Sequence, residues 1–273
     1  MTLEANISIV LYKQTKLDIN ELIKSCILAS DVKYIYLIDN SPTDKLCHEI
    51  DSNKKLRYIF SGKNIGFGAG HNLALKRTLL DGVKYHFIVN PDITCTPDVF
   101  KNLLDYMQSN KNIGMVAPCV LNTNLSLQYN AKLLPNPILS FIRRFMKNSF
   151  QKLNSQYELK NIKNDEVMNV PFLSGCFQLL SCDVIDDVGG FDERFFMYME
   201  DLDLSRRIHE SYKTIYYPFS KVIHKGEYAS RRFNKLFVFH LISAFKYYCK
   251  WGWVIDQKRK NINRNFCEKY NLF

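Results

Sequence analysis

The chain has 273 residues, of which 47% are hydrophobic and 23% are charged, and its formal net charge is +10 at pH 7. This composition is typical of a globular protein and is sufficient for a sizeable core, in one large α/β domain or in two small ones. The eight cysteines form no CxxC pair and show no regular spacing, which favours reduced thiols over a disulfide framework or a zinc site.

The N-terminal stretch "MTLEANISIVLYKQ" has no basic leader and no small-residue cleavage site, so we expect no signal peptide. Nor does any run of about 18 or more uncharged apolar residues predict a membrane span. Short apolar segments rich in β-branched and aromatic residues predict strands over 6–12, 32–39, 56–60 and 85–90.

Helical patterns lie between these predicted strands. "KLDINELIKSCILAS" separates the first two, with leucine and isoleucine at helical spacing, and "GHNLALKRTLLDG" separates the last two and ends at a capping glycine, Gly82. Alternation of strands and helices, with strands that are apolar throughout, predicts a mostly parallel sheet covered by helices on both faces.

Polar residues follow two of the predicted strands. Asp39 and Asn40 end the second strand, and Asn90 and Asp92 end the fourth. Ligands of parallel α/β sheets bind beyond the carboxyl ends of the strands, so both clusters should lie on one edge. The alternative is that "DNSPTD" and "NPD" are only good turn and cap sequences, but two such clusters on one edge favour a site.

A glycine-rich loop, "GKNIGFGAGHNLAL" (62–75), is expected between a strand and a helix, where backbone amides can approach a phosphate. It fails the dinucleotide fingerprint, because His71 stands in place of the last small residue and the loop does not follow the first strand. Tight packing is the alternative use of its glycines. A Rossmann oxidoreductase is therefore not favoured.

The stretch 122–170 is less readable, and we interpret it as a variable excursion from the domain. The most informative stretch follows it, "VGGFDERFFMYMEDLDLSRRIHESYKTIYYPFSKVIHKG" (188–226). Its helical part begins with Glu200, Asp201 and Asp203, where acids favour the helix dipole and cap free amides. Three acids in four residues exceed what capping needs, and aromatic neighbours can tune a carboxylate as a base.

Five motifs follow one another along the chain: "DN" (39–40), "NIGFGAGHN" (64–72), "NPD" (90–92), "GGFDERFFMYMEDLDLSRR" (189–207) and "VIH" (222–224). With these motifs in this order, the chain resembles family 2 glycosyltransferases of the GT-A fold over roughly residues 5–226. Within the family the chain looks most like bacterial rhamnosyltransferases that build O-antigen or related surface polysaccharides. This closer resemblance rests on "NPDI", "FFMYMEDLDL" and the tail "YASRRFNKLFVFHLISAFKYY".

The resemblance implies a role for each matching residue. Asp201 matches the catalytic base, supported by Glu200 and Asp203. Asp92 matches the last carboxylate of the family's metal-binding DxD-type motif, and His224 matches a histidine that completes the metal shell. The residues implied in nucleotide binding are Asp39, Asn40, Asn64, Gly66 and Asn90, the last of which stands where the family motif has an aspartate.

The resemblance also implies an α/β GT-A catalytic domain over 1–226 and an inverting transfer of a sugar, rhamnose from dTDP-rhamnose, to a lipid-linked or growing saccharide. The implied cofactor is a divalent cation, Mn²⁺ or Mg²⁺. We expect no nucleic acid as a partner.

From Lys221 to the end there are 12 Lys/Arg and 3 Asp/Glu, which gives this segment a net charge of +9. The basic, aromatic segment 227–273 predicts a helical tail on an anionic lipid surface, which would place the protein in the cytoplasm at the inner membrane. The alternative is a helix packed on the core with its lysines in water.

Two other functions remain open from the residues alone. A nucleotidyltransferase uses a related sheet but normally carries a glycine-rich, basic signature near the first strand, and "IVLYKQTKL" contains no glycine. A basic nucleic-acid-binding module is allowed by the charge, although base-reading motifs are missing.

Overall fold

The structure is a computed structural model and describes residues 4–140, 151–162, 165–226 and 235–272. Its strands are β1 Ala5–Leu11, β2 Val32–Asp39, β3 Leu56–Phe60, β4 Tyr85–Val89, β5 Ile93–Thr94, β6 Ile113–Leu121, β7 Ala131–Lys132, β8 Met168–Asn169, β9 Phe172–Leu173, β10 Phe177–Ser181 and β11 Lys213–His224. Its helices are α1 Lys16–Leu28, α2 Lys45–Glu49, α3 Phe67–Leu80, α4 Asp98–Ser109, α6 Gln151–Tyr157, α7 Cys182–Val188, α8 Glu200–His209, α9 Lys235–Trp251 and α10 Gln257–Lys269.

The central sheet is mixed and mostly parallel, in the order β3-β2-β1-β4-β10-β6-β11-β5, with β8 paired to β11. Strands β1 to β4 run parallel to one another, while β10 is antiparallel to both of its neighbours, β4 and β6. The four predicted strands and the two helices between them are confirmed. A separate ribbon pairs β7 with β9.

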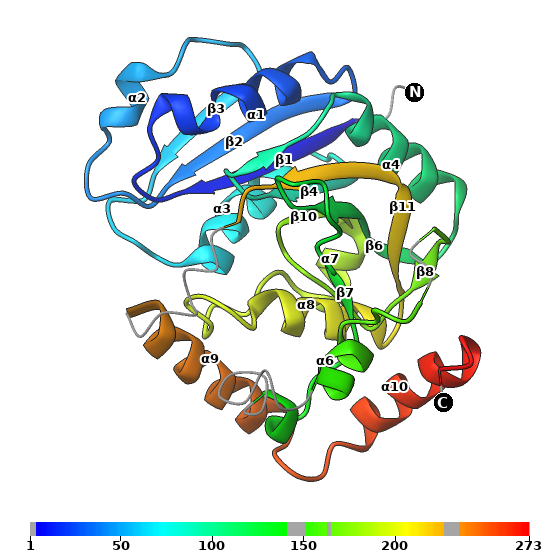
Figure 1. Cartoon of the computed structure of the whole chain (residues 1–273). Coiled ribbons are helices and arrows are strands. Elements are labelled where there is room, and N and C mark those ends of the chain that lie inside the picture. The colour runs from blue at the N-terminus through cyan, green and yellow to red at the C-terminus, as the bar shows by residue number, and fades with distance from the viewer. Residues whose placement is uncertain (1–3, 141–150, 163–164, 227–234, 273) are drawn as a thin grey trace.

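Helices cover both faces of the sheet, as expected (Figure 1). Alternate residues of one strand point to opposite faces, so in β10 Leu179 packs into the cluster under α1 and α4, and Leu180 into the cluster under α3, α7 and α8. Helix α1 buries Ile19, Leu22, Ile23 and Cys26, whereas the equally apolar Leu17 lies 85% exposed.

The tail helices α9 and α10 lie on the side of α8 that faces away from the sheet (Figure 1). A third apolar cluster joins them to the body of the protein, with contributions from Leu202 of α8, Tyr247 and Tyr248 of α9 and Phe195 of the preceding loop. No helix in the described part of the chain is long and apolar enough to cross a bilayer. Residues 141–150 of the expected excursion and 227–234 of the tail lie outside the described residues.

The described parts of the stretch 122–170 are built into the body of the protein. Leu133 and Tyr157 are buried in the cluster beneath the sheet, and Leu133 N donates a hydrogen bond to the Tyr157 carbonyl oxygen at 3.1 Å. The strand β7 within this stretch brings Lys132 beside Phe172 of β9. Short strands of this kind carry no periodic signal in the sequence.

Candidate active site at the carboxyl edge of the sheet

The two polar clusters meet at one edge, because the parallel strands that carry them end in register. Leu11 at the end of β1 pairs with Asp39 at the end of β2, and Ile9 of β1 pairs with Val89 at the end of β4. Asn90 follows Val89 directly and donates its backbone N–H to the Cys176 carbonyl oxygen at 2.9 Å. The expectation that both clusters share an edge is therefore met.

On the β2 side, side chains hold the glycine-rich loop in place. Asn40 Nδ2 donates to the Gly66 carbonyl oxygen at 3.0 Å, and Asn64 Oδ1 accepts from Gly66 N at 3.0 Å. The Asp39 carboxylate is fully buried and accepts from Ser41 N at 2.8 Å and from the Tyr58 hydroxyl at 2.5 Å. A nucleotide contact by Asp39 stays a prediction, since both of its oxygens have partners within the protein.

On the β4 side, Asp92 lies beside His224, because His224 of β11 pairs with Ile93 of β5. His224 Nε2 lies 3.3 Å from Asp92 Oδ1 and 3.4 Å from Asn90 Nδ2. His224 Nδ1 lies 2.7 Å from Gln128 Oε1, and an amide oxygen only accepts, so Nδ1 carries the hydrogen. In the neutral imidazole Nε2 then carries a lone pair, which accepts from Asn90 Nδ2 here and can bind a cation in its place.

This group of atoms fits a divalent cation in part. The side-chain oxygens Asn90 Oδ1 and Asp92 Oδ1 are buried and accept no hydrogen bond from the described residues. Burial opposes ionisation of Asp92, but the hydrogen bond and charge of His224, together with hydrogen bonds from the backbone of Asp92 and Gly226, lower the pKa of Asp92 below its ordinary value. Among the described residues, no group of three or more His, Cys, Asp or Glu side chains is arranged so that it could hold a metal ion, so the protein offers a sparse ligand set here.

The acidic pair begins α8. Asp201 Oδ2 accepts from Gly175 N at 2.9 Å and Oδ1 accepts from Leu202 N at 2.8 Å, while the side chain keeps partial exposure. Glu200 is buried, and its Oε2 has no hydrogen-bond partner among the described residues. Burial raises the pKa of Asp201, and burial together with Asp201 raises the pKa of Glu200 to about 8. Two carboxylates with raised pKa values in one place are typical of a site of proton transfer.

The turn before α8 is strained. Tyr198 and Met199 both adopt positive φ, 68° and 69°, which non-glycine residues rarely do. The turn is held from two sides. The Phe196 carbonyl oxygen accepts from Phe67 N at 3.0 Å, and from α9 Ser243 Oγ donates to the Met197 carbonyl oxygen at 2.8 Å. Strain held by surrounding structure is frequent at functional sites.

Asp203, predicted as a supporting acid, faces the tail. Its carboxylate is fully buried and binds Arg207 Nε at 2.8 Å, Trp251 Nε1 at 2.7 Å and Lys250 Nζ at 2.7 Å. These contacts join α8 to α9, so Asp203 can support Asp201 only indirectly, through the helix that both share. They also favour the alternative in which this face of the tail packs on the body of the protein.

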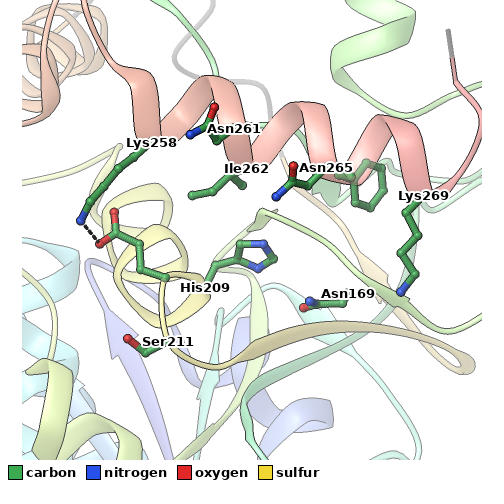
Figure 2. A pocket seen from close by; sticks show the side chains of 10 residues that line it. Asn169, His209, Ser211, Lys258, Asn261, Ile262, Asn265 and Lys269 are labelled. Atoms are coloured by element: carbon green, nitrogen blue, oxygen red, sulfur yellow. Dashed lines mark hydrogen bonds and ion pairs between the residues drawn. The ribbon is translucent and has the colours of Figure 1, made fainter.

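A cavity of about 570 Å³ lies elsewhere, between α10, the C-terminal end of α8 and β8 (Figure 2). Its lining includes Asn169, His209 and Asn265, and Lys258 pairs with Glu210 at its rim at 3.1 Å. None of the predicted site residues lines it. The candidate site is therefore the edge of the sheet, which combines carboxylates, an imidazole and strained backbone.

Sequence reasoning missed several residues of this edge. Gln128, Lys132 and Gly175 all come from segments that the sequence left unassigned, and each reaches the site only through tertiary packing. Tyr58 lies in a predicted strand, and only the pairing of β3 with β2 reveals its contact with Asp39. The one signal in the sequence that could have pointed to Tyr58 is its position near the end of a parallel strand.

The chain is similar in sequence and in fold to proteins of known family. The family described as "Glycosyl transferase family 2" matches residues 7–189. Rhamnosyltransferase WbbL of Escherichia coli K12 is 28% identical over 253 residues, which cover 90% of each chain. N-acetylglucosaminyl-diphospho-decaprenol L-rhamnosyltransferase of Mycobacterium tuberculosis is 26% identical over 72% of this chain and 68% of that protein.

Among solved structures, GalNAc-T7 with UDP, GalNAc and Mn²⁺ superposes with a TM-score of 0.61 at 15% identity. The match covers 82% of this chain but 44% of that one, so this chain spans less than half of that protein. At this level of identity the likeness concerns the fold alone, and it confirms the GT-A fold expected from the sequence.

Proposed function

Because the chain belongs to glycosyl transferase family 2 and is a glycosyltransferase, we propose that it transfers rhamnose from dTDP-rhamnose with inversion. The acceptor in this proposal is a lipid-linked or growing saccharide of a bacterial surface polysaccharide. Two relatives that cover most of this chain are rhamnosyltransferases by name, and one of them is named for a diphospho-decaprenol acceptor. The likeness to these relatives supports the choice of donor.

The observation that carries the proposal is the position of Asp201. Its carboxylate is fixed by two backbone N–H groups at the edge of the sheet where ligands of such sheets bind. In an inverting displacement the acceptor hydroxyl attacks the anomeric carbon opposite the leaving diphosphate, and a carboxylate takes its proton. Asp201 is the proposed base, and its partial exposure lets a hydroxyl approach.

The diphosphate end of the donor is proposed to lie at Asp92 and His224. Asp92 Oδ1, His224 Nε2 and Asn90 Oδ1 would hold a divalent cation, which matches the preference of Mn²⁺ and Mg²⁺ for oxygen with some imidazole. A bound cation stabilises negative charge on the departing diphosphate. Asn40, Asn64 and Gly66 form the loop proposed to face the nucleotide.

A second element of the proposal is contact with the membrane surface. One side of α9 packs inward, and the other exposes Val238, Leu241, Ile242 and Phe245, followed by exposed Trp253, Val254 and Ile255. We name this set the outer surface of the tail. Apolar residues at this helical spacing, in a segment with a net charge of +9, are typical of helices that lie on anionic lipid.

The donor is tested by transfer and binding together. Sugar transfer and release of the nucleoside diphosphate are measured with dTDP-rhamnose as donor. The same two quantities are measured with UDP-sugars and GDP-sugars, and each donor is tested with and without Mn²⁺ or Mg²⁺. Asp201→Asn should abolish transfer and leave dTDP binding in calorimetry nearly unchanged, with Asp105→Asn, which removes an exposed ion pair with Lys101 on α4, as control. Equal loss of binding and transfer contradicts the assignment of the base, and selective use of a UDP- or GDP-sugar contradicts the rhamnose donor.

Membrane contact is tested by co-sedimentation with vesicles. The wild type should bind phosphatidylglycerol vesicles better than phosphatidylcholine vesicles, and Ile242→Ser with Phe245→Ser should weaken binding at least about 10-fold because apolar burial drives insertion. Leu17→Ser, also an exposed leucine but on α1, serves as control. Unchanged binding of the double variant would show that the outer surface does not meet lipid.

A further inference from the structure

Three consecutive residues of the loop between β9 and β10 connect the parts of the site. Ser174 Oγ accepts from Lys132 Nζ at 3.3 Å, Gly175 N donates to Asp201 Oδ2 at 2.9 Å, and the Cys176 carbonyl oxygen accepts from Asn90 N at 2.9 Å. Consecutive Cα atoms are about 3.8 Å apart, so these three contacts lie within roughly 8 Å along the backbone. Lys132 therefore contacts the residue that precedes Gly175, whose N–H group holds Asp201.

The position of Lys132 is fixed by the ribbon of β7 and β9. Lys132 pairs with Phe172 across the ribbon, and its ammonium nitrogen lies 5.6 Å from the Phe172 ring centroid. Its neighbour Ala131 is buried against the core. The backbone around Lys132 is thus well anchored, and its side chain reaches from this anchor toward the loop that holds Asp201.

We propose that Lys132 is a positioning residue for the transfer reaction, whose ammonium group keeps the neighbouring Asp201 side chain in its carboxylate form. This inference rests on the proposed role of Asp201 as the base. A base must be ionised when the acceptor hydroxyl arrives, and burial of Asp201 disfavours its charged form. The ammonium group of Lys132, on β7, acts against this effect of burial.

The titratable groups that face Asp201 come from its own helix and from the loop before β10. On the same helix Glu200 is buried and adjacent, and on the facing loop the Cys176 thiol is buried. Burial is the main cause that raises the pKa of the Cys176 thiol, and the negative charge of Asp92 raises it further. Burial raises the pKa of Asp201, while the N–H groups of Gly175 and Leu202 and the charge of Lys132 act in the opposite direction.

The test compares pH profiles of kcat/KM for the wild type, Lys132→Met, Lys132→Arg and the control Lys258→Met, whose lysine is exposed on α10. Lys132→Met should lose up to about 100-fold at low pH and much less at high pH, because the carboxylate persists only at higher pH without the cation. Lys132→Arg should restore the profile. An equal loss at every pH, or a raised KM for the acceptor with an unshifted profile, overturns the inference.

A second readout does not depend on transfer. The ¹³Cγ resonance of Asp201 in aspartate-labelled protein, assigned by its absence in Asp201→Asn, is titrated in the wild type and in Lys132→Met. The midpoint should move to higher pH in the variant, and an unchanged midpoint in a folded variant contradicts the inference. If the wild type transfers no sugar from any donor, the proposed function fails, while this titration still decides the role of Lys132.

Discussion

A buried ion pair joins the tail to the helix of the proposed base, and its removal should destabilise the whole protein. Arg206 of α8 is 1% exposed and makes two 2.7 Å hydrogen bonds to Asp256, which is 5% exposed. The guanidinium also lies 4.0 Å from the Trp251 ring centroid. Asp256 is the N-cap of α10, where it accepts from Arg259 N at 3.0 Å.

Asp256→Ala leaves the buried guanidinium without its carboxylate and removes the cap. Loss of one partner of a buried pair costs about 3–5 kcal/mol, and loss of an N-cap about 1 kcal/mol. The Tyr247 hydroxyl at 3.4 Å and Glu210 at 3.8 Å remain near Arg206 and offset a part of this cost. The expected decrease in the free energy of unfolding is therefore about 3–4 kcal/mol.

Urea unfolding followed by two probes measures this change. The protein has two tryptophans, Trp251 and Trp253, so fluorescence reports on the tail, whereas far-UV circular dichroism reports on all helices and strands. Both transitions should coincide and shift together in Asp256→Ala. Lys258→Ala, which removes an exposed pair with Glu210, should cost less than about 1 kcal/mol.

Two outcomes would refute the reasoning. A decrease below about 1 kcal/mol would mean that the Arg206 guanidinium finds water or another partner when Asp256 is removed. A shift of the fluorescence transition alone would mean that the tail unfolds as a separate unit, and that α8 does not need it.

Three further predictions concern single residues of the site. Gly175→Ala should lower transfer at least about 10-fold while dTDP binding in calorimetry is kept, because the new Cβ would lie 2.9 Å from Asp201 Cβ. Gly66→Ala should lower the free energy of unfolding, measured in urea, by about 2–4 kcal/mol. Its φ is +94°, and the new Cβ would clash with the Phe196 carbonyl oxygen. Gly62 also has positive φ but has open space around it, so Gly62→Ala should cost less. Burial and Asp201 raise the pKa of Glu200 from 4.5 to about 8, so folding favours the protonated side chain. As pH rises through this range, the wild type should lose stability relative to Glu200→Gln. Urea unfolding curves of both proteins at about pH 5 and about pH 9 measure this difference.

The sequence predicted those parts of the site that depend on local pattern and strand direction. Asp39 and Asn90 share an edge because their strands are parallel, and strand type was readable from continuous apolar runs. Glu200 and Asp201 begin a helix, as acids in a first turn indicate. Local chemistry fixes such features, so no knowledge of tertiary packing was needed.

Features that depend on long-range pairing were not predictable. Gln128 and Lys132 reach the site through β6, β7 and β11, and a strand of two residues has no period to detect. The antiparallel course of β10 between β4 and β6 has no local signature either. In α1 both Leu17 and Leu22 are apolar, and only the packed structure shows that Leu17 faces water.

The two sides of α9 bring the proposed membrane contact and the proposed chemistry into one element. Its inner side holds the strained turn through Ser243 and through Phe239, whose ring centroid lies 4.6 Å from that of Phe196. This turn precedes Asp201 by a few residues, and positive φ at Tyr198 persists only while its surroundings enforce it. Docking of the outer surface on lipid would favour the packed position of α9, and thereby the geometry of Asp201, because binding to one state stabilises that state. Membrane binding and catalysis in this enzyme are therefore expected to be coupled through α9.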